Sequence, residues 1–182
     1  MTRETDDSAP AIFLDRDGTI MRDVDYCDDP GDVEILPGVA DALRRLKGAG
    51  YKIIVVTNQS GIGRGYFDET AYRAVEREVE RQLGDGVVEA TYFCADGPEA
   101  ASDRRKPGIG MVREAQRDHR LDLTRSFMLG DKKSDIDCGR GAGLQTVLVR
   151  TGYGSRENDC TPDFIAADVP AAAEIIISRH NG

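Results

Sequence analysis

Two carboxylates follow an apolar run near the start of the chain, and their spacing is suited to chemistry on phosphorus. The run AIFL, residues 11–14, ends at Asp15, and Asp17 follows two positions later, just before Gly18. A carboxylate at the end of a strand can attack phosphorus as a nucleophile. A second carboxylate beside it can protonate a leaving oxygen and later take a proton from water. Asp15 and Asp17 are therefore the first candidates for catalysis.

Three later segments contain the other groups that phosphoryl transfer needs. Thr57 ends the apolar run YKIIVVT and offers a hydroxyl to a phosphoryl oxygen, and Lys106 in RRKP offers a positive charge. Asp131 in MLGD can hold a hard cation together with Asp15, which reduces the repulsion between an anionic nucleophile and an anionic phosphate. Each motif alone is more simply explained as a turn or a helix start. Their joint occurrence after apolar runs favours catalysis.

The elements that must position these groups alternate between strands and helices. Apolar runs predict strands at residues 11–14, 51–57, 88–94, 126–129 and 145–149. Helical spacing and capping residues predict helices around 39–46, 68–83, 110–120, 134–142 and 170–179. This order is typical of an α/β fold, a Rossmann-like parallel sheet with helices on both faces. Because ligands bind off the carboxyl ends of such strands, we expect the site to contain Asp15, Asp17, Thr57, Asn58, Lys106, Asp131 and Asp135.

Length, composition and charge narrow the class of protein. The 182 residues, 40% of them hydrophobic and 31% charged, predict one globular domain at residues 10–182 behind a flexible arm at residues 1–9. The polar start MTRETDDSAP is unlike a signal peptide, and no apolar run has the length of a membrane span. The net charge of −9 argues against nucleic acid or an anionic membrane as a partner. We therefore expect a cytoplasmic, monomeric protein with a small phosphorylated partner.

Four segments together resemble the signature motifs of the haloacid dehalogenase-like hydrolases. They are FLDRDGT, VVTNQSG, RKP and MLGDKKSD, and the resemblance spans about residues 11–150. It implies a phosphatase that depends on one Mg²⁺ ion and works through an aspartyl-phosphate intermediate. Some members of this family carry a large cap domain. Here the 40 positions from Asp17 to Thr57 and the stretch from Thr57 to Lys106 are largely filled by predicted elements, so we expect no large cap.

The resemblance also implies a role for each motif residue. Asp15 would be the nucleophile, and Asp17 the general acid and base. Asp15, Asp131 and the backbone carbonyl of Asp17 would hold Mg²⁺, with Asp135 in support, while Thr57 and Lys106 would steady the phosphoryl group. The residues implied in substrate binding are Asp23, Val24, Asp25, Tyr26, Asn58, Gln59, Ser60, Arg105 and Lys132. In addition, three arginines in or beside the motif loops are candidates for holding a second phosphate, namely Arg64, Arg104 and Arg105.

The amino-acid sequences of several segments narrow the range of expected substrates. FLDRDGTI, VVTNQSGIGRGYF, DRRKPGIGM and VLVRTGYG resemble a subgroup that acts on D-glycero-D-manno-heptose 1,7-bisphosphate or on histidinol phosphate. The arginine-rich loops favour a second phosphate over a cationic amine, so removal of the 7-phosphate of the heptose bisphosphate is the first expectation. Histidinol phosphate is the alternative substrate. A nucleic-acid end phosphatase and a non-catalytic binding module are weaker alternatives.

The positions of the cysteines indicate whether the chain could bind a second metal, zinc. Cys27, Cys94, Cys138 and Cys160 show no C-x-x-C spacing, which predicts reduced thiols. Many members of the subgroup carry a zinc loop, with a Cys-x-His pair and a Cys-x-Cys pair before the RKP lysine. Here the stretch FCADGPEAASDRRKP keeps only Cys94. One thiolate does not hold a structural zinc ion, so we predict that zinc is absent and that Mg²⁺ is the cofactor.

Overall fold

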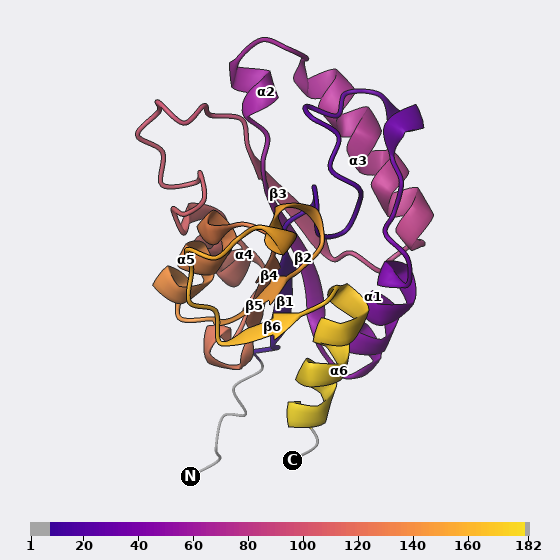
Figure 1. Cartoon of the computed structure of the whole chain (residues 1–182), viewed down its shortest axis with the longest axis vertical. Helices are drawn as coiled ribbons and strands as arrows, with labels where there is room; N and C mark the ends of the chain where they lie inside the picture. The colour runs from indigo at the N-terminus through magenta and orange to yellow at the C-terminus, as the bar shows by residue number, and fades with distance from the viewer. Residues whose placement is uncertain (1–7, 181–182) are drawn as a thin grey trace.

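In residues 8–180, which the computed structural model describes, six strands form one parallel sheet in the order β3-β2-β1-β4-β5-β6 (Figure 1). The chain runs outward from β1 to β2 and β3 and then returns to β4 beside β1, so its winding reverses at β1. The strands are β1 (Ala11–Leu14), β2 (Lys52–Asn58), β3 (Ala90–Cys94), β4 (Phe127–Gly130), β5 (Gln145–Val149) and β6 (Phe164–Ala166).

Helices cover both faces of the sheet (Figure 1). On one face α1 (Val39–Gly48) packs against α6 (Val169–His180), and α3 (Glu69–Leu83) lies beside α1. On the other face α4 (Gly110–His119) packs on β2 and β3, and α5 (Lys133–Ala142) packs on β4 and β5. The shorter elements are α2 (Ser60–Gly63) and the 3₁₀ turns at Pro30–Asp32, Leu123–Arg125 and Gly152–Ser155.

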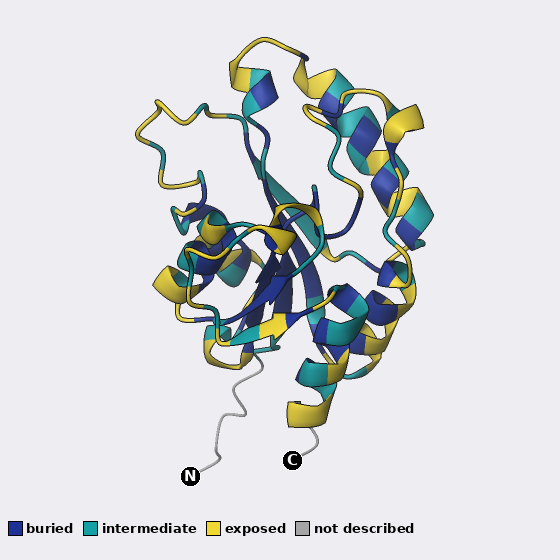
Figure 2. Cartoon of the chain, in the orientation of Figure 1, coloured by how far each residue is buried: buried dark blue, intermediate teal, exposed yellow. Residues whose placement is uncertain are grey.

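Strand β1 is buried along its whole length because both of its faces are covered (Figure 2). Ile12 and Leu14 pack into the core beneath α1 and α6, whereas the alternate residue Phe13 packs beneath α4 and α5. Burial on two sides explains why this strand reads as a continuous apolar run rather than as an alternating one. Close packing on both faces gives the residue that follows the strand, Asp15, a well-defined position.

The registers of the central strands bring their carboxyl ends to one level. Leu14 pairs with Val55 of β2 and with Leu129 of β4. Asp15 comes next, and its backbone N–H donates to the carbonyl oxygen of Leu129 at 3.1 Å. The residues that end β2 and follow β4 therefore meet Asp15 at the carboxyl edge of the sheet, where the winding reverses and ligands bind in open α/β sheets.

The predicted fold class is confirmed, and all five predicted strands are present, the third beginning at Ala90 rather than at residue 88. Two short elements were missed, β6 and α2. Strand β6 has three residues at the sheet edge, and Ile165 within it is 54% exposed, so it has no apolar run to detect. Helix α2 has four residues, which is too short for a helical period to show. Nothing the size of a large cap domain is inserted anywhere in residues 8–180.

Ala9, just before β1, pairs with Leu121 after α4 in an isolated parallel bridge. Most of the predicted arm at residues 1–9 lies outside the described residues. From Ser8 to His180, none of the helices combines the length and the apolar composition that crossing a bilayer requires.

Candidate active site

A buried ion-pair cluster lies at the carboxyl edge of the sheet and joins three of the predicted residues. The Lys106 Nζ atom donates to Asp15 Oδ1 at 2.8 Å, to Asp135 Oδ1 at 2.7 Å and to the carbonyl oxygen of Val56 at 2.8 Å. Lys106 is only 4% exposed. Burial by itself lowers the pKa of Lys106, but the carboxylates of Asp135 and Asp15 outweigh this effect and raise the pKa above its ordinary value. Lys106 is therefore a fixed positive charge beside Asp15.

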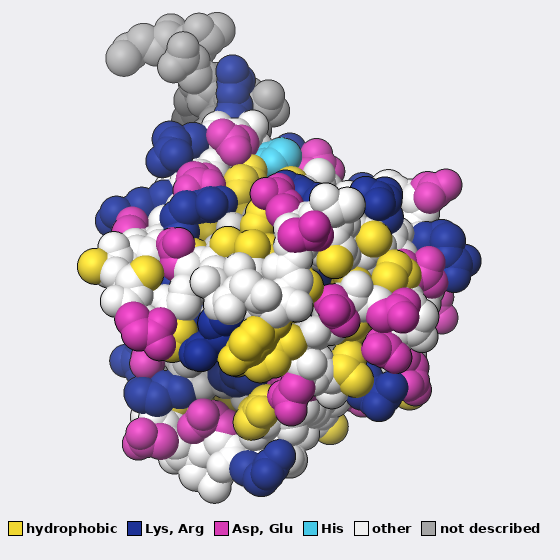
Figure 3. Space-filling model, turned by 90° about the horizontal axis from the view of Figure 1, so that it is seen from above, with side chains coloured by type: hydrophobic (Ala, Val, Ile, Leu, Met, Phe, Trp, Pro, Cys, Tyr) yellow, Lys and Arg dark blue, Asp and Glu magenta, His cyan; other side chains and the backbone are white. Residues whose placement is uncertain are grey.

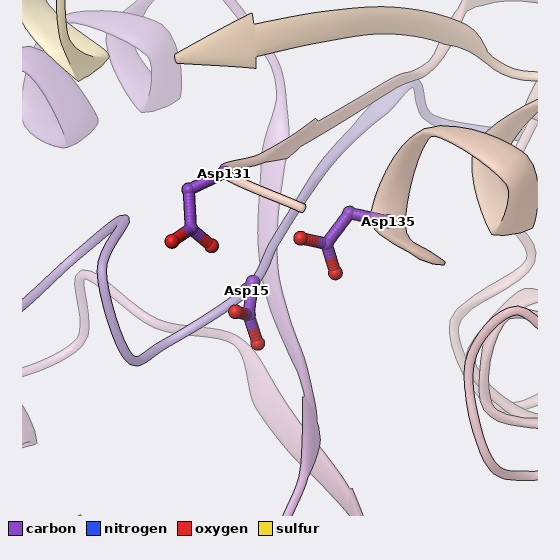
Figure 4. A group of neighbouring side chains, drawn as sticks. All are labelled: Asp15, Asp131 and Asp135. Carbon is purple, nitrogen blue, oxygen red and sulfur yellow. The ribbon is translucent and has the colours of Figure 1, made fainter. Parts of the chain in front are cut away.

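Asp131 supplies a third buried carboxylate to the same place (Figure 4). One oxygen atom from each of Asp15, Asp131 and Asp135 lies within 4.8 Å of the other two. Asp131 Oδ2 accepts a hydrogen bond from the Tyr153 N–H at 2.8 Å, whereas its Oδ1 atom has no hydrogen-bond partner among the described residues. Burial raises the pKa of Asp131 well above its ordinary value, and the negative charges of Asp15 and Asp135 raise it further.

This donor set fits a magnesium ion. Mg²⁺ prefers oxygen ligands and is usually bound by one or two carboxylates plus water and substrate. Asp131 Oδ1 is buried without a hydrogen-bond partner among the described residues, so it would be available to a cation, and a cation would relieve the crowding of the three carboxylates. Within residues 8–180 these three aspartates are the one group of three or more His, Cys, Asp or Glu side chains close enough to share a metal ion.

Two glycines make room for the Asp131 carboxylate. A Cβ atom at Gly18 or at Gly152 would lie 2.3 Å from Asp131 Oδ2, and both residues have positive φ angles. The Thr151 hydroxyl donates to the carbonyl oxygen of Gly18 at 2.7 Å and ties the turn after β5 to the turn after β1. This turn was not among the predicted site residues. Its signal was the segment VRTGYG, which follows a predicted strand and must therefore lie at the same sheet edge.

Asp17 is held on two sides. The buried guanidinium of Arg16 bonds its carboxylate, with Nη2 at 3.0 Å from Oδ1 and Nε at 3.2 Å from Oδ2. The Gln59 Nε2 atom donates to Asp17 Oδ2 at 2.9 Å and to the Thr57 hydroxyl oxygen at 2.8 Å. Arg16 also lies over the ring of Tyr72, with its Cζ atom 5.6 Å from the ring centroid. The candidate general acid is thus immobilised by two residues, of which Arg16 was not among the predicted site residues.

A cavity of about 260 Å³ opens beside Asp17 and collects most of the residues predicted to bind substrate. Its walls come from the loop after β1, the start of α2, and the loops before α4 and after β4 and β5. The predicted residues that line it are Asp23, Val24, Asp25, Tyr26, Asn58, Gln59, Ser60, Arg105 and Lys132. Lining residues that were not predicted are Cys27, Gly61, Ser134 and Tyr153.

The three candidate arginines take different positions. Arg105 lines the cavity, and its Nη1 atom donates to the carbonyl oxygen of Asp96 at 2.9 Å. Arg104 forms an ion pair with Glu114 at 2.8 Å, and the guanidinium of Arg64 lies 4.0 Å from the carboxylate of Glu99. Of the three, Arg105 is therefore the one placed to meet a ligand in the cavity.

Asn58 and Lys132 make contacts that define their positions. The Asn58 carboxamide donates to the Lys106 carbonyl oxygen and accepts from the Lys106 N–H, both at 3.0 Å, so it holds the backbone that carries the buried lysine. The Lys132 Nζ atom lies 3.5 Å from Asp23 Oδ2 and 4.6 Å from the centroid of the Tyr153 ring. Lys132 thus brings a positive charge to the cavity wall from the turn after β4.

The cysteines are free thiols. Cys27, Cys94 and Cys138 are buried and Cys160 is half-buried. The Cys94 Sγ atom lies 3.5 Å from Asp96 Oδ2 and 3.8 Å from the Ser102 hydroxyl oxygen, in the loop between β3 and α4. Cys94 therefore ends β3, just before the loop where the zinc ligands of relatives were expected, and it is in polar contact with two side chains of that shortened loop.

The parallel α/β sheet places a buried carboxylate–lysine cluster at its switch point, which suits chemistry on a negatively charged substrate. Residues 103–172 match the model of the family described as HAD-hydrolase-like. A relative from Thermosynechococcus vestitus, D-glycero-D-manno-heptose-1,7-bisphosphate 7-phosphatase, is 40% identical over 93% of this chain and 96% of its own length. The D-glycero-beta-D-manno-heptose-1,7-bisphosphate 7-phosphatase of Photorhabdus laumondii is 42% identical over 79% of this chain and 81% of its own.

A solved structure agrees with these relatives. The D,D-heptose 1,7-bisphosphate phosphatase of B. bronchiseptica, complexed with magnesium and phosphate, superimposes with a TM-score of 0.87 and 33% identity, covering 93% of this chain and 99% of that one. The chain belongs to the haloacid dehalogenase-like hydrolases. The predicted family and the predicted enzyme class, a phosphoric monoester hydrolase, are thereby confirmed.

Proposed function

We propose that this protein is a Mg²⁺-dependent phosphatase that removes the 7-phosphate of D-glycero-D-manno-heptose 1,7-bisphosphate. The observation that carries the proposal is the buried contact of Asp15 with Lys106, 2.8 Å apart, next to the unpartnered oxygen of Asp131. A nucleophile, a fixed positive charge and a cation site lie together at one sheet edge. The identity of the substrate is taken from relatives that match nearly the whole chain and are named for this activity.

The side chains support a two-step reaction. An Asp15 oxygen attacks phosphorus and forms an aspartyl-phosphate, while the bond from phosphorus to the sugar oxygen breaks and Asp17 gives that oxygen its proton. Water then attacks the same phosphorus, Asp17 takes the proton of the water, and the bond to Asp15 breaks to release inorganic phosphate. Lys106 offsets the negative charge that accumulates beside Asp15 in both steps, and the Thr57 hydroxyl binds a phosphoryl oxygen.

Asp15, Asp131 and the backbone carbonyl of Asp17 are the groups we assign to Mg²⁺, with Asp135 in support. When bound, the ion supplies positive charge that cancels the repulsion between a carboxylate and a phosphate. Asp135 contributes by bonding Lys106 through Oδ1 and the Lys132 N–H, at 3.1 Å, through Oδ2. It therefore fixes both the lysine and the turn that carries Asp131.

The charges in the cavity favour a second phosphate. Arg105 and Lys132 both line it and provide cationic groups. Arginine suits phosphate because its planar guanidinium can donate two parallel hydrogen bonds. Asp23 and Asp25 line the same cavity and would suit a cationic amine, which is the observation that favours histidinol phosphate as the second candidate. Because Lys132 lies 3.5 Å from Asp23 and offsets its charge, we place the bisphosphate first.

The surface supports a small-molecule substrate rather than nucleic acid. Acidic and basic side chains are interspersed over the face that Figure 3 shows, and basic atoms lie in a hollow near its centre. With a net charge of −9 there is no general attraction for a polyanion. A monomeric state and a cytoplasmic location stay predictions from the sequence.

The substrate assignment predicts a preference that kinetics can measure. The kcat/KM for phosphate release should be at least about 10-fold higher with D-glycero-D-manno-heptose 1,7-bisphosphate than with histidinol phosphate, because a charged group placed to bind a partner contributes about 1.4 kcal/mol or more. Arg105→Met should reduce this ratio, whereas Arg104→Met, which removes an arginine paired with Glu114, should leave it unchanged. A higher kcat/KM with histidinol phosphate would reverse the assignment.

The metal assignment predicts the response to chelation. Phosphate release should fall to background after treatment with EDTA and return when Mg²⁺ is added, because without a cation Asp15 and Asp131 repel the substrate. Metal analysis of protein purified without chelator should find zinc far below one ion per chain, since Cys94 is the one cysteine kept from the expected zinc loop. Activity that survives EDTA would contradict the magnesium site, and stoichiometric zinc would contradict the second expectation.

A further inference from the structure

The Gln59 side chain bonds both Asp17, the proposed acid for the leaving oxygen, and Thr57, the proposed ligand of a phosphoryl oxygen. These two residues act on opposite ends of the phosphorus–oxygen bond that breaks. The Gln59 Nε2 atom lies 2.9 Å from Asp17 Oδ2 and 2.8 Å from Thr57 Oγ1. Gln59 is 5% exposed, and its backbone N–H donates to the carbonyl oxygen of Cys94 at 2.7 Å, which anchors it to the end of β3. The resemblance to relatives placed this residue in a substrate-binding segment. The structure shows a different use of its amide.

The polarity of these hydrogen bonds determines what Gln59 does. An ionised carboxylate can only accept, so the amide must present its nitrogen, and the two protons of that nitrogen go to Asp17 and Thr57. Thr57 therefore accepts from Gln59 and keeps its own hydroxyl proton to donate. A phosphoryl oxygen is the acceptor that this proton suits. A protonated Asp17 still has one oxygen without a proton, and that oxygen can accept the hydrogen bond from Gln59.

We propose that Gln59 is a positioning residue that sets the general acid Asp17 and the Thr57 hydroxyl at a fixed distance and orientation from each other. The inference rests on the proposed phosphatase function. Arg16 holds Asp17 from the other side, with Nη2 3.0 Å from Oδ1, so the loss of Gln59 frees one side of the carboxylate without releasing it. The effect of Gln59 should then fall on proton delivery to the leaving oxygen more than on phosphate binding.

The leaving group of the substrate distinguishes an effect on proton delivery from an effect on phosphate binding. A sugar alkoxide is a poor leaving group and needs a proton from Asp17, whereas p-nitrophenolate leaves readily without one. The ratio kcat/KM covers the steps up to the first release of product, so it isolates leaving-group departure from the later hydrolysis of the aspartyl-phosphate. A defect in general-acid positioning lowers kcat/KM for a sugar phosphate more than for p-nitrophenyl phosphate. A defect in phosphate binding or in folding lowers both alike.

The test compares Gln59→Met with the parent on a sugar bisphosphate and on p-nitrophenyl phosphate, with saturating Mg²⁺. We expect kcat/KM for the sugar substrate to fall about 10- to 100-fold, and the sugar-to-aryl ratio to fall at least about 5-fold. Gln59→Leu removes the same donors without adding a charge and should show the same selective loss. The matched control is Gln116→Met, on the half-buried side of α4, which should leave both values unchanged.

Asp17→Asn defines the full effect of losing the general acid. In that background Gln59→Met should cause no further fall in the sugar-to-aryl ratio, because the two changes disable the same proton transfer. An equal loss on both substrates in both Gln59 variants, or a further selective loss in the Asp17→Asn background, would overturn the positioning role. If the parent releases phosphate from neither substrate, the proposed function itself is wrong, and that result is distinct from a parent that is active with both.

Discussion

Replacing Asp15 with asparagine is expected to lower phosphate release by at least about 10⁴-fold, which is the scale on which the loss of a covalent nucleophile acts. An amide oxygen has the position of the carboxylate oxygen but lacks its negative charge, so it does not form the acyl-phosphate. Asparagine can still accept the hydrogen bond that Lys106 donates to Oδ1 at 2.8 Å, and the site should keep its shape. The measurement is inorganic phosphate released under saturating Mg²⁺ and substrate.

The matched control for this variant is Asp137→Asn. Asp137 also lies close to a lysine, with its Oδ2 atom 3.1 Å from Lys133 Nζ, but this pair is on the exposed side of α5. Exposed pairs of this kind contribute little, so the control should retain the parent rate. If Asp15→Asn kept activity within about 10-fold of the parent, covalent catalysis by this residue would be excluded.

Removing the buried lysine is expected to affect both activity and stability. Lys106→Met leaves the carboxylates of Asp15 and Asp135 without the ammonium that lies within 2.8 Å of both. Breaking a buried ion pair on one side costs about 3–5 kcal/mol of unfolding free energy, and phosphate release should fall about 10²- to 10³-fold because no charge offsets the transferred group. Denaturant unfolding and phosphate release measure the two effects separately.

The stability loss should depend on pH. Burial raises the pKa of Asp135, and the charge of Lys106 opposes this rise, so removal of Lys106 raises the pKa further. A carboxyl group whose pKa is higher in the folded state supports stability below its unfolded pKa, near 4, and loses that contribution as the pH rises. The deficit of Lys106→Met relative to the parent should therefore be larger at pH 8 than at pH 5. Lys133→Met, on the exposed side of α5, should show neither effect, and an equal unfolding free energy in Lys106→Met and the parent would contradict the account.

The sequence predicted the central strands and the place of the site for a simple physical reason. A strand that is covered on both faces is apolar throughout, so an acid directly after such a run marks the carboxyl end of the strand. Asp15 after β1 and Asp131 after β4 both show this pattern, and the parallel order brings the two ends together. The edge strand β6 shows no such pattern, because Ile165 faces solvent and Phe164 is only partly buried.

The contacts within the site were less accessible to sequence reasoning. The bonds from Lys106 to Asp135 and from Gln59 to Asp17 join residues that are 29 and 42 positions apart, and they depend on side-chain rotamers in separate loops. Spacing along the chain carries no information about such contacts. An arginine between two acids gives no pattern that separates a solvated side chain from one that turns back to bond its neighbour, as Arg16 does with Asp17.

The central claim is that Asp15 carries the phosphoryl group during turnover, and trapping of the acyl-phosphate tests it most directly. The Asp17→Asn variant with p-nitrophenyl phosphate and Mg²⁺ should accumulate the intermediate, because the first step needs no acid and the second lacks its base. Borohydride reduces an acyl-phosphate to an alcohol, so peptide mass spectrometry after rapid quenching should find homoserine at position 15. An unmodified Asp15, or reduction at another carboxylate, would contradict the account.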